Sequence, residues 1–131
     1  MTKLNSLADH LKKYLLPAFE RKAKSIIAID VRNLTSYTDF LIIIEANSQR
    51  QVSSIAEHMI FRMKEKKTSA IGAEGIKEGE WALLDYGDVI IHVFESRIKA
   101  YYNLEGLWAD APLIDLSGFE TETREDINEN E

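Results

Sequence analysis

Residues 81–94, WALLDYGDVIIHVF, constrain the fold of this chain more than any other stretch. They form two apolar runs joined by Asp85-Tyr86-Gly87-Asp88, where the glycine can adopt positive φ and the acids can bond the local backbone. The second run is rich in β-branched and aromatic residues, so the stretch predicts a β-hairpin. Because both faces of the second run are apolar, we expect a central hairpin with a layer on each side.

Further strands are predicted before the hairpin in the sequence. Residues 25–31 and 39–46 are apolar, and their short connection favours an antiparallel pair. Residues 68–72 form a weaker candidate strand, and the glycine-rich, charged residues 73–80 predict a loop. A strand, a long helix over residues 48–67 and a further strand imply a right-handed crossover.

Helical periodicity appears in two long segments. Residues 5–24 carry apolar side chains at helical spacing, but Pro17 either kinks this helix or opens a second, shorter one. Residues 48–67 have one apolar stripe, with Ser48 as the N-cap and Gln51 as its capping-box partner. Short helical turns are expected at residues 95–102 and 104–108. The predicted fold is α/β (mixed α+β), a five-stranded mixed β-sheet with helices on its faces.

The charge of the chain is unevenly distributed. The formal net charge is −6, but residues 120–131 hold six acids and one arginine, so residues 1–119 carry a net charge of −1. We assign residues 1–115 to a single domain and predict that residues 116–131 form a disordered acidic tail. The near-neutral body disfavours an RNA-binding module, which needs a basic face. An acidic patch that meets a basic protein remains open.

Several classes of protein are disfavoured by what the sequence lacks. There is no cysteine, which excludes disulfides and thiolate metal sites. No apolar run approaches the roughly 20 residues that a membrane-spanning helix requires. The N-terminus has the pattern of neither a secretion signal nor an organelle transit peptide. We therefore expect a cytoplasmic protein.

The histidines do not indicate a metal site. His10, His58 and His92 are isolated in the sequence, and no HxxxH pair is present. His92 lies between Ile90 and Phe94 on one strand face, which favours a hydrogen-bonded structural histidine over a contact or catalytic role. No familiar glycine-rich phosphate loop occurs either. We expect no metal and no cofactor.

Four aspartates at predicted strand ends raise the alternative of a nucleotidyltransferase-like enzyme. Asp30, Asp39, Asp85 and Asp88 could in principle hold magnesium for nucleotidyl transfer. That chemistry usually needs two carboxylates one residue apart on one strand, and none of the four has such a neighbour. Roles as turn formers and caps are favoured, and no catalytic residue is predicted.

The order and spacing of several motifs resemble one known family. The motifs are Thr38-Asp39-Phe40, Arg50-Gln51-Val52, Ile55-Ala56, Glu74-Gly75, the block from Trp81 to Val89, His92-Val93-Phe94, Tyr101-Tyr102-Asn103-Leu104-Glu105 and Leu107-Trp108-Ala109-Asp110-Ala111-Pro112. Together they resemble the ribosome silencing factor family, also called Iojap-related. The resemblance covers residues 23–112 and leaves the N-terminal helix and the acidic tail outside.

This resemblance implies a fold related to nucleotidyltransferases, with nucleotidyltransferase-like topology but without their catalysis. It implies binding to ribosomal protein L-fourteen on the large ribosomal subunit, which blocks joining of the small subunit and represses translation under nutrient limitation. It also implies a homodimer in some members. The partner would be a basic protein, so we expect acids around an aromatic anchor. The candidate residues are Trp81, Tyr86, Asp88, Glu105, Trp108 and Asp110.

Two points about these candidates stay open. Trp81 and Trp108 could each close the core or serve as a binding anchor. The sequence also departs from the family pattern at three places. Residues 45–48 replace a Ser-Gly-rich turn, Lys99 stands where arginine is common, and Gly106 stands where a basic residue is frequent.

Overall fold

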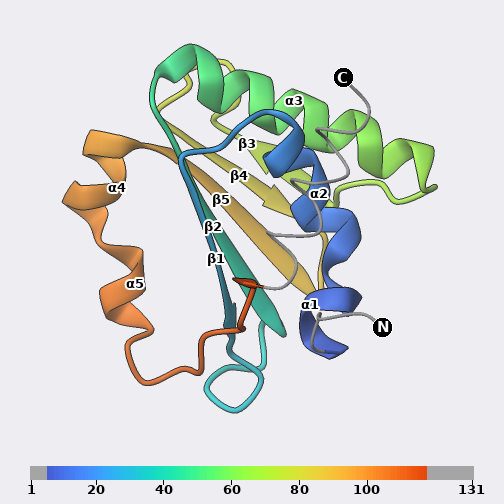
Figure 1. The fold of residues 1–131 in the computed structure, drawn as a ribbon, viewed down its shortest axis with the longest axis vertical. Coiled ribbons are helices and arrows are strands. Elements are labelled where there is room, and N and C mark those ends of the chain that lie inside the picture. The colour runs from blue at the N-terminus through green and yellow to red at the C-terminus, as the bar shows by residue number, and fades with distance from the viewer. Residues whose placement is uncertain (1–5, 118–131) are drawn as a thin grey trace.

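Five strands form one mixed sheet in the computed structural model, which describes residues 6–117 (Figure 1). The strands are β1 (Ser25–Asp30), β2 (Phe40–Ala46), β3 (Gly72–Glu74), β4 (Trp81–Asp85) and β5 (Val89–Glu95), in the order β1-β2-β5-β4-β3. β2 and β5 are parallel, and every other neighbouring pair is antiparallel. The predicted five-stranded mixed sheet and the antiparallel first pair are confirmed.

The predicted hairpin is formed by β4 and β5, and β5 is the middle strand of the sheet. All seven residues of β5 are buried, as expected from its two apolar faces. Gly87 in the connecting turn has φ +85°, and its N–H donates to Asp85 Oδ1 at 2.8 Å. The turn therefore uses the glycine and the acid as the sequence predicts.

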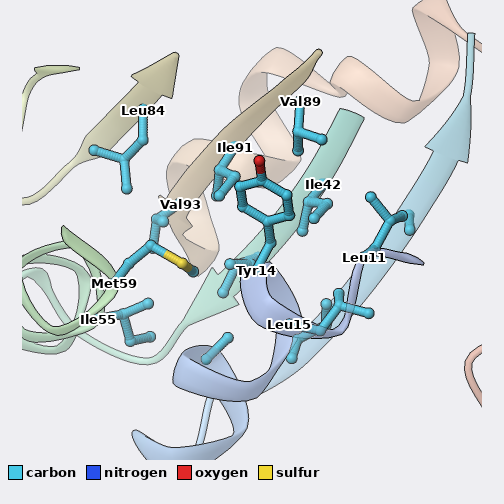
Figure 2. Close-up of a cluster of buried hydrophobic side chains, with 14 of the residues drawn as sticks. Leu11, Tyr14, Leu15, Ile42, Ile55, Met59, Leu84, Val89, Ile91 and Val93 are labelled. Carbon is cyan, nitrogen blue, oxygen red and sulfur yellow. The ribbon is translucent and has the colours of Figure 1, made fainter. Parts of the chain in front are cut away.

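One face of the sheet is covered by three helices, α1 (Ser6–His10), α2 (Lys12–Glu20) and α3 (Gln49–Glu65) (Figure 1). Figure 2 shows the apolar side chains that meet there from α2, α3 and the sheet, including Leu15, Met59 and Ile91. α3 begins as predicted, because Ser48 Oγ accepts a hydrogen bond from Gln51 N at 3.1 Å. The Gln51 side chain in turn accepts from Asn47 N at 2.6 Å.

The N-terminal helical segment is interrupted at Leu11 and not at Pro17 as predicted. Leu11 separates α1 from α2, and Pro17 lies inside α2. Proline removes the N–H that would bond the carbonyl four residues earlier, which belongs to Lys13. Lys13 is exposed, so water can satisfy its carbonyl and the helix continues.

The edge strand β3 lies further along the chain than the strand predicted at residues 68–72. Residues 68–71 are not in a strand, and β3 occupies Gly72–Glu74, the start of the predicted loop. All three residues of β3 are exposed at the edge of the sheet, so no apolar pattern marks them in the sequence. Gly75 ends the strand with φ +76°, and a Cβ there would come within 2.0 Å of Trp81 O.

The other face of the sheet is covered by α4 (Ser96–Tyr102), α5 (Leu104–Leu107) and the segment that follows (Figure 1). Both short helices match the predicted helical turns. The following segment pairs with β1, where Ile114 N donates to Ala28 O at 2.9 Å and Asp30 N donates to Pro112 O at 3.0 Å. Leu116 is buried in the larger core cluster, so packing extends beyond the predicted domain boundary at residue 115. The rest of the predicted tail, residues 118–131, lies outside the described residues.

Candidate partner-binding face

Helices α4 and α5 form a corner whose geometry is fixed by local contacts. The Glu95 side chain caps α4 by accepting a hydrogen bond from Arg97 N at 2.9 Å. Asn103 ends α4 in the left-handed conformation with φ +46°, which turns the chain directly into α5. Neither helix contains a fully buried residue. The corner therefore packs with one side and leaves its outer side open.

The inner side of this corner lies over a small aromatic cluster. The Trp81 ring lies 4.8 Å from both the Phe94 and the Tyr102 ring, measured between centroids. Its indole Nε1–H donates to His92 Nδ1 at 3.0 Å. Trp81 is half-buried, so this geometry favours a packing role while one edge stays accessible. Trp108 is also half-buried and packs against the cluster of buried apolar residues on this face, which includes Leu41 and Ile43.

His92 is the hydrogen-bonded structural histidine that the sequence favours. It is 5% exposed in the middle of β5. Because Nδ1 accepts from Trp81, the neutral ring carries its proton on Nε2. Burial lowers the pKa of His92 from 6.5 to about 4, since the charged ring would lose its hydration.

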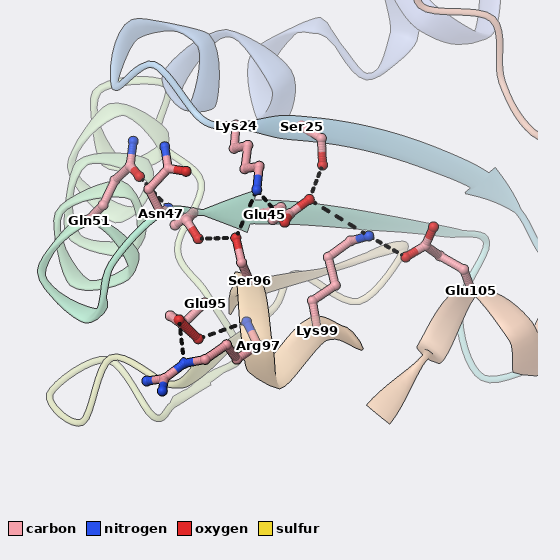
Figure 3. A network of polar contacts seen from close by, with 11 residues as sticks. Lys24, Ser25, Glu45, Asn47, Gln51, Glu95, Ser96, Arg97, Lys99 and Glu105 are labelled. Carbon is pink, nitrogen blue, oxygen red and sulfur yellow. Dashed lines mark hydrogen bonds and ion pairs between the residues drawn. The ribbon is translucent and has the colours of Figure 1, made fainter. Parts of the chain in front are cut away.

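A carboxylate lies beside this cluster on the same face of the sheet. Glu45 of β2 accepts a hydrogen bond from Ser25 Oγ at 3.0 Å and pairs with Lys24 at 3.4 Å and Lys99 at 3.9 Å (Figure 3). Burial alone would raise the pKa of Glu45, but hydrogen bonds from Ser96 and Ser25 and the two lysines outweigh it and lower that pKa. Glu45 is therefore a charged anchor for α4.

Lys99 extends this network from α4 to α5. Its Nζ lies 2.6 Å from Glu105 Oε1, while the same nitrogen reaches back to Glu45 (Figure 3). The Lys99 side chain is 19% exposed and that of Glu105 is 37% exposed. Part of the charge of Glu105 is thus already neutralised, and the residue helps to hold the corner. The departure from the family pattern at position 99 preserves a cation at this place.

The outer side of the corner carries exposed apolar groups that the sequence analysis did not select. We call this surface the α4–α5 face and define it by Tyr101, Tyr102, Glu105, Leu107, Trp108 and Asp110. Tyr101 is 80% exposed and Leu107 is 76% exposed. Large apolar side chains in helices without a buried residue are a signal for an interaction surface. A sequence cannot easily give this signal, because the same residues could equally well face a core.

The six predicted partner-binding residues do not form one surface. Trp81, Glu105, Trp108 and Asp110 belong to the α4–α5 side, and Asp110 is exposed in the turn after α5. Tyr86 and Asp88 lie in the hairpin turn, at the far end of the seven-residue strand β5 from α4. At about 3.3 Å per residue this strand separates them from α4 by about 20 Å, whereas the segment after α5 returns to their end of the sheet, where Asp30 N donates to Pro112 O.

Tyr86 also lies on the opposite face of the sheet. Its ring is 5.5 Å from that of Tyr14, and both pack with the larger core cluster. Burial, with a smaller contribution from Tyr14, raises the pKa of Tyr86 to about 12. Its buried hydroxyl has no hydrogen-bond partner in the part of the chain that the structure describes. The structure therefore places Tyr86 as a core residue with a partly accessible edge.

Two of the four strand-end acids, Asp30 and Asp85, form local structural contacts. Asp30 binds Arg32 through two side-chain contacts at 2.9 and 2.6 Å, and Asp85 caps the hairpin turn. The Asp30–Arg32 hydrogen bonds lower the pKa of Asp30. Within residues 6–117, no group of three or more histidines and acids could hold a metal ion. In the same range, no helix is long and apolar enough to cross a membrane.

The fold is thus a mixed α+β sheet protein in which a helical corner presents exposed apolar side chains beside acids. Comparison with known proteins identifies the family. The family model for "Ribosomal silencing factor during starvation" matches residues 5–131, and the chain belongs to this family. The match includes the N-terminal helical segment and the acidic tail, which the motif resemblance leaves outside.

Individual relatives agree with this assignment. The chain is 37% identical over 99 residues to ribosomal silencing factor RsfS of Halalkalibacterium halodurans, covering 76% of this chain and 85% of the relative. It is 39% identical over 97 residues to RsfS of Bacillus subtilis, covering 74% and 82%. Protein Iojap of Zea mays, which is chloroplastic, is 38% identical over 99 residues, covering 76% of this chain and 43% of the relative.

Solved structures show the same fold. A crystal structure of a Chromobacterium violaceum protein matches with a TM-score of 0.75 and 33% identity, covering 80% of this chain and 88% of that protein. One from Bacillus halodurans matches with a TM-score of 0.73 and 32% identity, covering 82% and 98%.

Proposed function

We propose that this protein represses translation by binding ribosomal protein L-fourteen on the large ribosomal subunit and blocking the joining of the small subunit under nutrient limitation. Membership of the ribosomal silencing factor family supports the ribosome as its target. The observation that carries the proposal is the α4–α5 face, where an outward apolar surface lies beside acids on a rigid support.

The chemistry of this face suits a basic ribosomal protein. Leu107 and Tyr101 supply apolar area that is open in the isolated protein. Trp108 lies half-buried beside them and can anchor the centre of a contact. Asp110 is exposed at the border, where an acid can orient a basic partner. When the α4–α5 face is bound to the large subunit, the body of the protein would block the approach of the small subunit.

The proposed mechanism is steric and needs no catalysis. Asp30 and Asp85 are engaged by Arg32 and by the Gly87 N–H, which fits structural roles for the strand-end acids. We therefore assign the protein a non-enzymatic role, with no cofactor. A cytoplasmic location follows from the proposed target, because that is where bacterial ribosomal subunits join.

Charge reversals test whether the α4–α5 face or the hairpin turn contacts the subunit. We expect Asp110→Lys to weaken binding to isolated large subunits by about 1–3 kcal/mol, because it sets like charge against a basic surface. Asp88→Lys is the matched control, since Asp88 is equally an exposed turn acid but lies in the hairpin turn, outside the α4–α5 face. Binding would be measured by sedimentation with large subunits, and folding by circular dichroism.

The possible outcomes distinguish the α4–α5 face from the hairpin turn. Loss of binding in Asp88→Lys alone would move the contact to the hairpin turn. Normal binding by both folded variants would show that neither acid takes part in the contact. Leu107→Ala would then test whether the apolar part of the α4–α5 face binds the subunit. If that variant also binds normally, the α4–α5 face is not the binding surface.

Self-association is expected to use the same apolar surface. A second copy could cover Tyr101 and Leu107 in the absence of a ribosome. Light scattering over a range of protein concentrations measures the oligomeric state. Leu107→Asp is the variant expected to disrupt the dimer. A wild-type protein that stays monomeric at high micromolar concentration would exclude the homodimer for the isolated chain.

A further inference from the structure

A second candidate site lies on the helical side of the molecule, on the opposite face of the sheet from α4 and α5. It is a groove of about 440 Å³ at the end of α2 and along the exposed side of α3. The residues that line it are Arg21, Arg50, Ser54, Glu57, His58 and Phe61. Nothing in the proposed L-fourteen contact uses these residues, so the inference goes beyond the proposed function.

The two arginines in this groove differ from the other arginines that the structure describes. Within residues 6–117, Arg32, Arg62 and Arg97 each form an ion pair with a carboxylate. Arg21 and Arg50 form none, and both line the same groove. A guanidinium presents a planar fork of N–H donors that matches the oxygens of a phosphate. Two such forks in one groove make a site for an anion with several oxygens.

Arg21 is held in place by its neighbours. His58 Nε2 lies 2.8 Å from Glu20 Oε1, and Arg21 Nη2 lies 3.3 Å from His58 Nδ1. Because the carboxylate only accepts, the proton is on Nε2, and Nδ1 accepts a hydrogen bond from Arg21. The Gln51 side chain also donates to the Arg21 carbonyl at 3.2 Å. The remaining donors of Arg21 are thus oriented without being neutralised by an acid.

The other groove residues suit a nucleotide better than a bare anion. Phe61 is 59% exposed, and a base can stack on an open aromatic ring. The Ser54 hydroxyl can donate to a phosphate or a ribose oxygen. The Glu57 carboxylate would repel a phosphate placed next to it, so phosphate belongs beside the arginines. The same carboxylate can accept a hydrogen bond from a ribose hydroxyl or a base amino group.

We propose that this groove binds a short single-stranded RNA segment, with backbone phosphates at Arg21 and Arg50 and one base against Phe61. The lining residues Arg21, Arg50, Glu57 and Phe61 are exposed, so the strand can continue beyond the groove on both sides. The volume is within the range of sites that hold a small organic ligand. The near-neutral charge of the whole body does not reveal this site, because acids offset the arginines in the sum, including Glu57 in the groove and Glu20 beside His58.

The test uses the full chain and a fluorescently labelled RNA hexanucleotide, with binding followed by anisotropy. We expect Arg21→Gln and Arg50→Gln each to weaken binding about tenfold, as loss of a charged hydrogen-bonded contact does. Each change should also reduce the slope of log affinity against log salt by about 0.7. Phe61→Ala should weaken binding at least about fivefold through lost stacking. Lys66→Gln is the control, because Lys66 is exposed at the end of α3 but does not line the groove.

The result can overturn the proposal in three ways. Absence of measurable RNA binding at low salt would overturn it directly. Equal binding by wild type and both arginine variants would place the RNA elsewhere. A mononucleotide that binds as tightly as the hexanucleotide would overturn the assignment to a strand. None of these outcomes depends on large subunits, so failure here is distinguishable from failure of the L-fourteen proposal.

Discussion

The two faces of the sheet differ in what covers them. On one face, α2 and α3 pack through fully buried side chains such as Leu15, Ile55 and Met59 onto an apolar layer. On the other face, α4 and α5 have no fully buried residue, and their side chains Ile98 and Leu104 pack half-buried onto a smaller apolar cluster. The first face is held by apolar area removed from water, and the second by less apolar area together with polar contacts of defined geometry, such as the Glu45–Lys99 pair.

This difference teaches which changes should affect folding and which should affect recognition. Apolar burial stabilises in proportion to area and tolerates no new polar group. Hydrogen bonds and partly exposed ion pairs contribute less to stability but fix direction. A corner that is positioned by polar contacts can keep apolar groups such as Leu107 outside the core, where a partner can reach them.

The largest expected effect is on the helical face. Ile55 is 0% exposed in α3, so Ile55→Ala should lower the free energy of unfolding by about 2–5 kcal/mol through lost burial and a new cavity. Leu107→Ala, the matched change on the other side, should alter stability by no more than about 0.5 kcal/mol. Urea unfolding followed by circular dichroism measures both. Equal costs for the two variants would contradict the division between the faces.

The second effect concerns the buried histidine. The pKa of His92 falls from 6.5 in the unfolded chain to about 4 in the folded protein, so only the unfolded chain binds this proton between those values. Stability from this residue is complete above pH 6.5 and is lost as pH falls towards 4. The loss should reach about 3 kcal/mol.

His92→Gln provides the comparison for this pH dependence. The variant cannot titrate at this position, so its stability should change less than that of the wild type between pH 6.5 and 4, whatever its absolute stability. Urea unfolding across that range measures the difference. Parallel curves for the two proteins would show that His92 does not titrate as its burial requires.

The sequence predicted the elements that have a periodic apolar pattern better than the elements that lack one. Both apolar faces of β5 and the stripe of α3 were visible as periodic patterns, and the structure confirms them. The edge strand β3 was misplaced because three exposed residues have no apolar pattern. The local rule for proline predicts a kink or a second helix at Pro17, but the helices divide at Leu11 and Pro17 lies inside α2, where the residue Lys13 is exposed and water can replace the missing N–H.

The candidate site was harder to predict for a related reason. Acids and aromatics could be selected by type, but only the sheet geometry shows that Tyr86 and Asp88 lie at the far end of β5 from Trp81. The pairing of Lys99 with Glu105 joins α4 to α5 across six positions in the sequence, and no local pattern marks it. The unpaired state of Arg21 and Arg50 is likewise a property of their three-dimensional surroundings.

A smaller effect is expected from the pair that holds the corner. Because Glu105 is 37% exposed, its ion pair with Lys99 should contribute only about 0.2–1 kcal/mol to stability. Lys99→Gln should nevertheless weaken large-subunit binding, since it releases α5 from Glu45. A double-mutant cycle of Lys99→Gln and Glu105→Gln, measured for both unfolding and subunit binding, tests this. Additive effects on binding would show that the pair does not position α5.

The smallest expected effect is that of the acidic tail. Residues 120–131 hold six acids and one arginine, so they have little apolar surface to offset the entropy lost on ordering. A chain that ends at Leu116 should therefore melt within about 1–2 °C of the full chain, less than a change of 1 kcal/mol would produce. A chain that ends at Pro112 is the comparison, because it also removes the buried residues Ile114 and Leu116 and the Ile114 hydrogen bond to β1. The second truncation should lower the melting temperature by several degrees. A comparable drop in the first would mean that the tail contributes to the packed body, and the boundary between body and tail would then lie beyond Leu116.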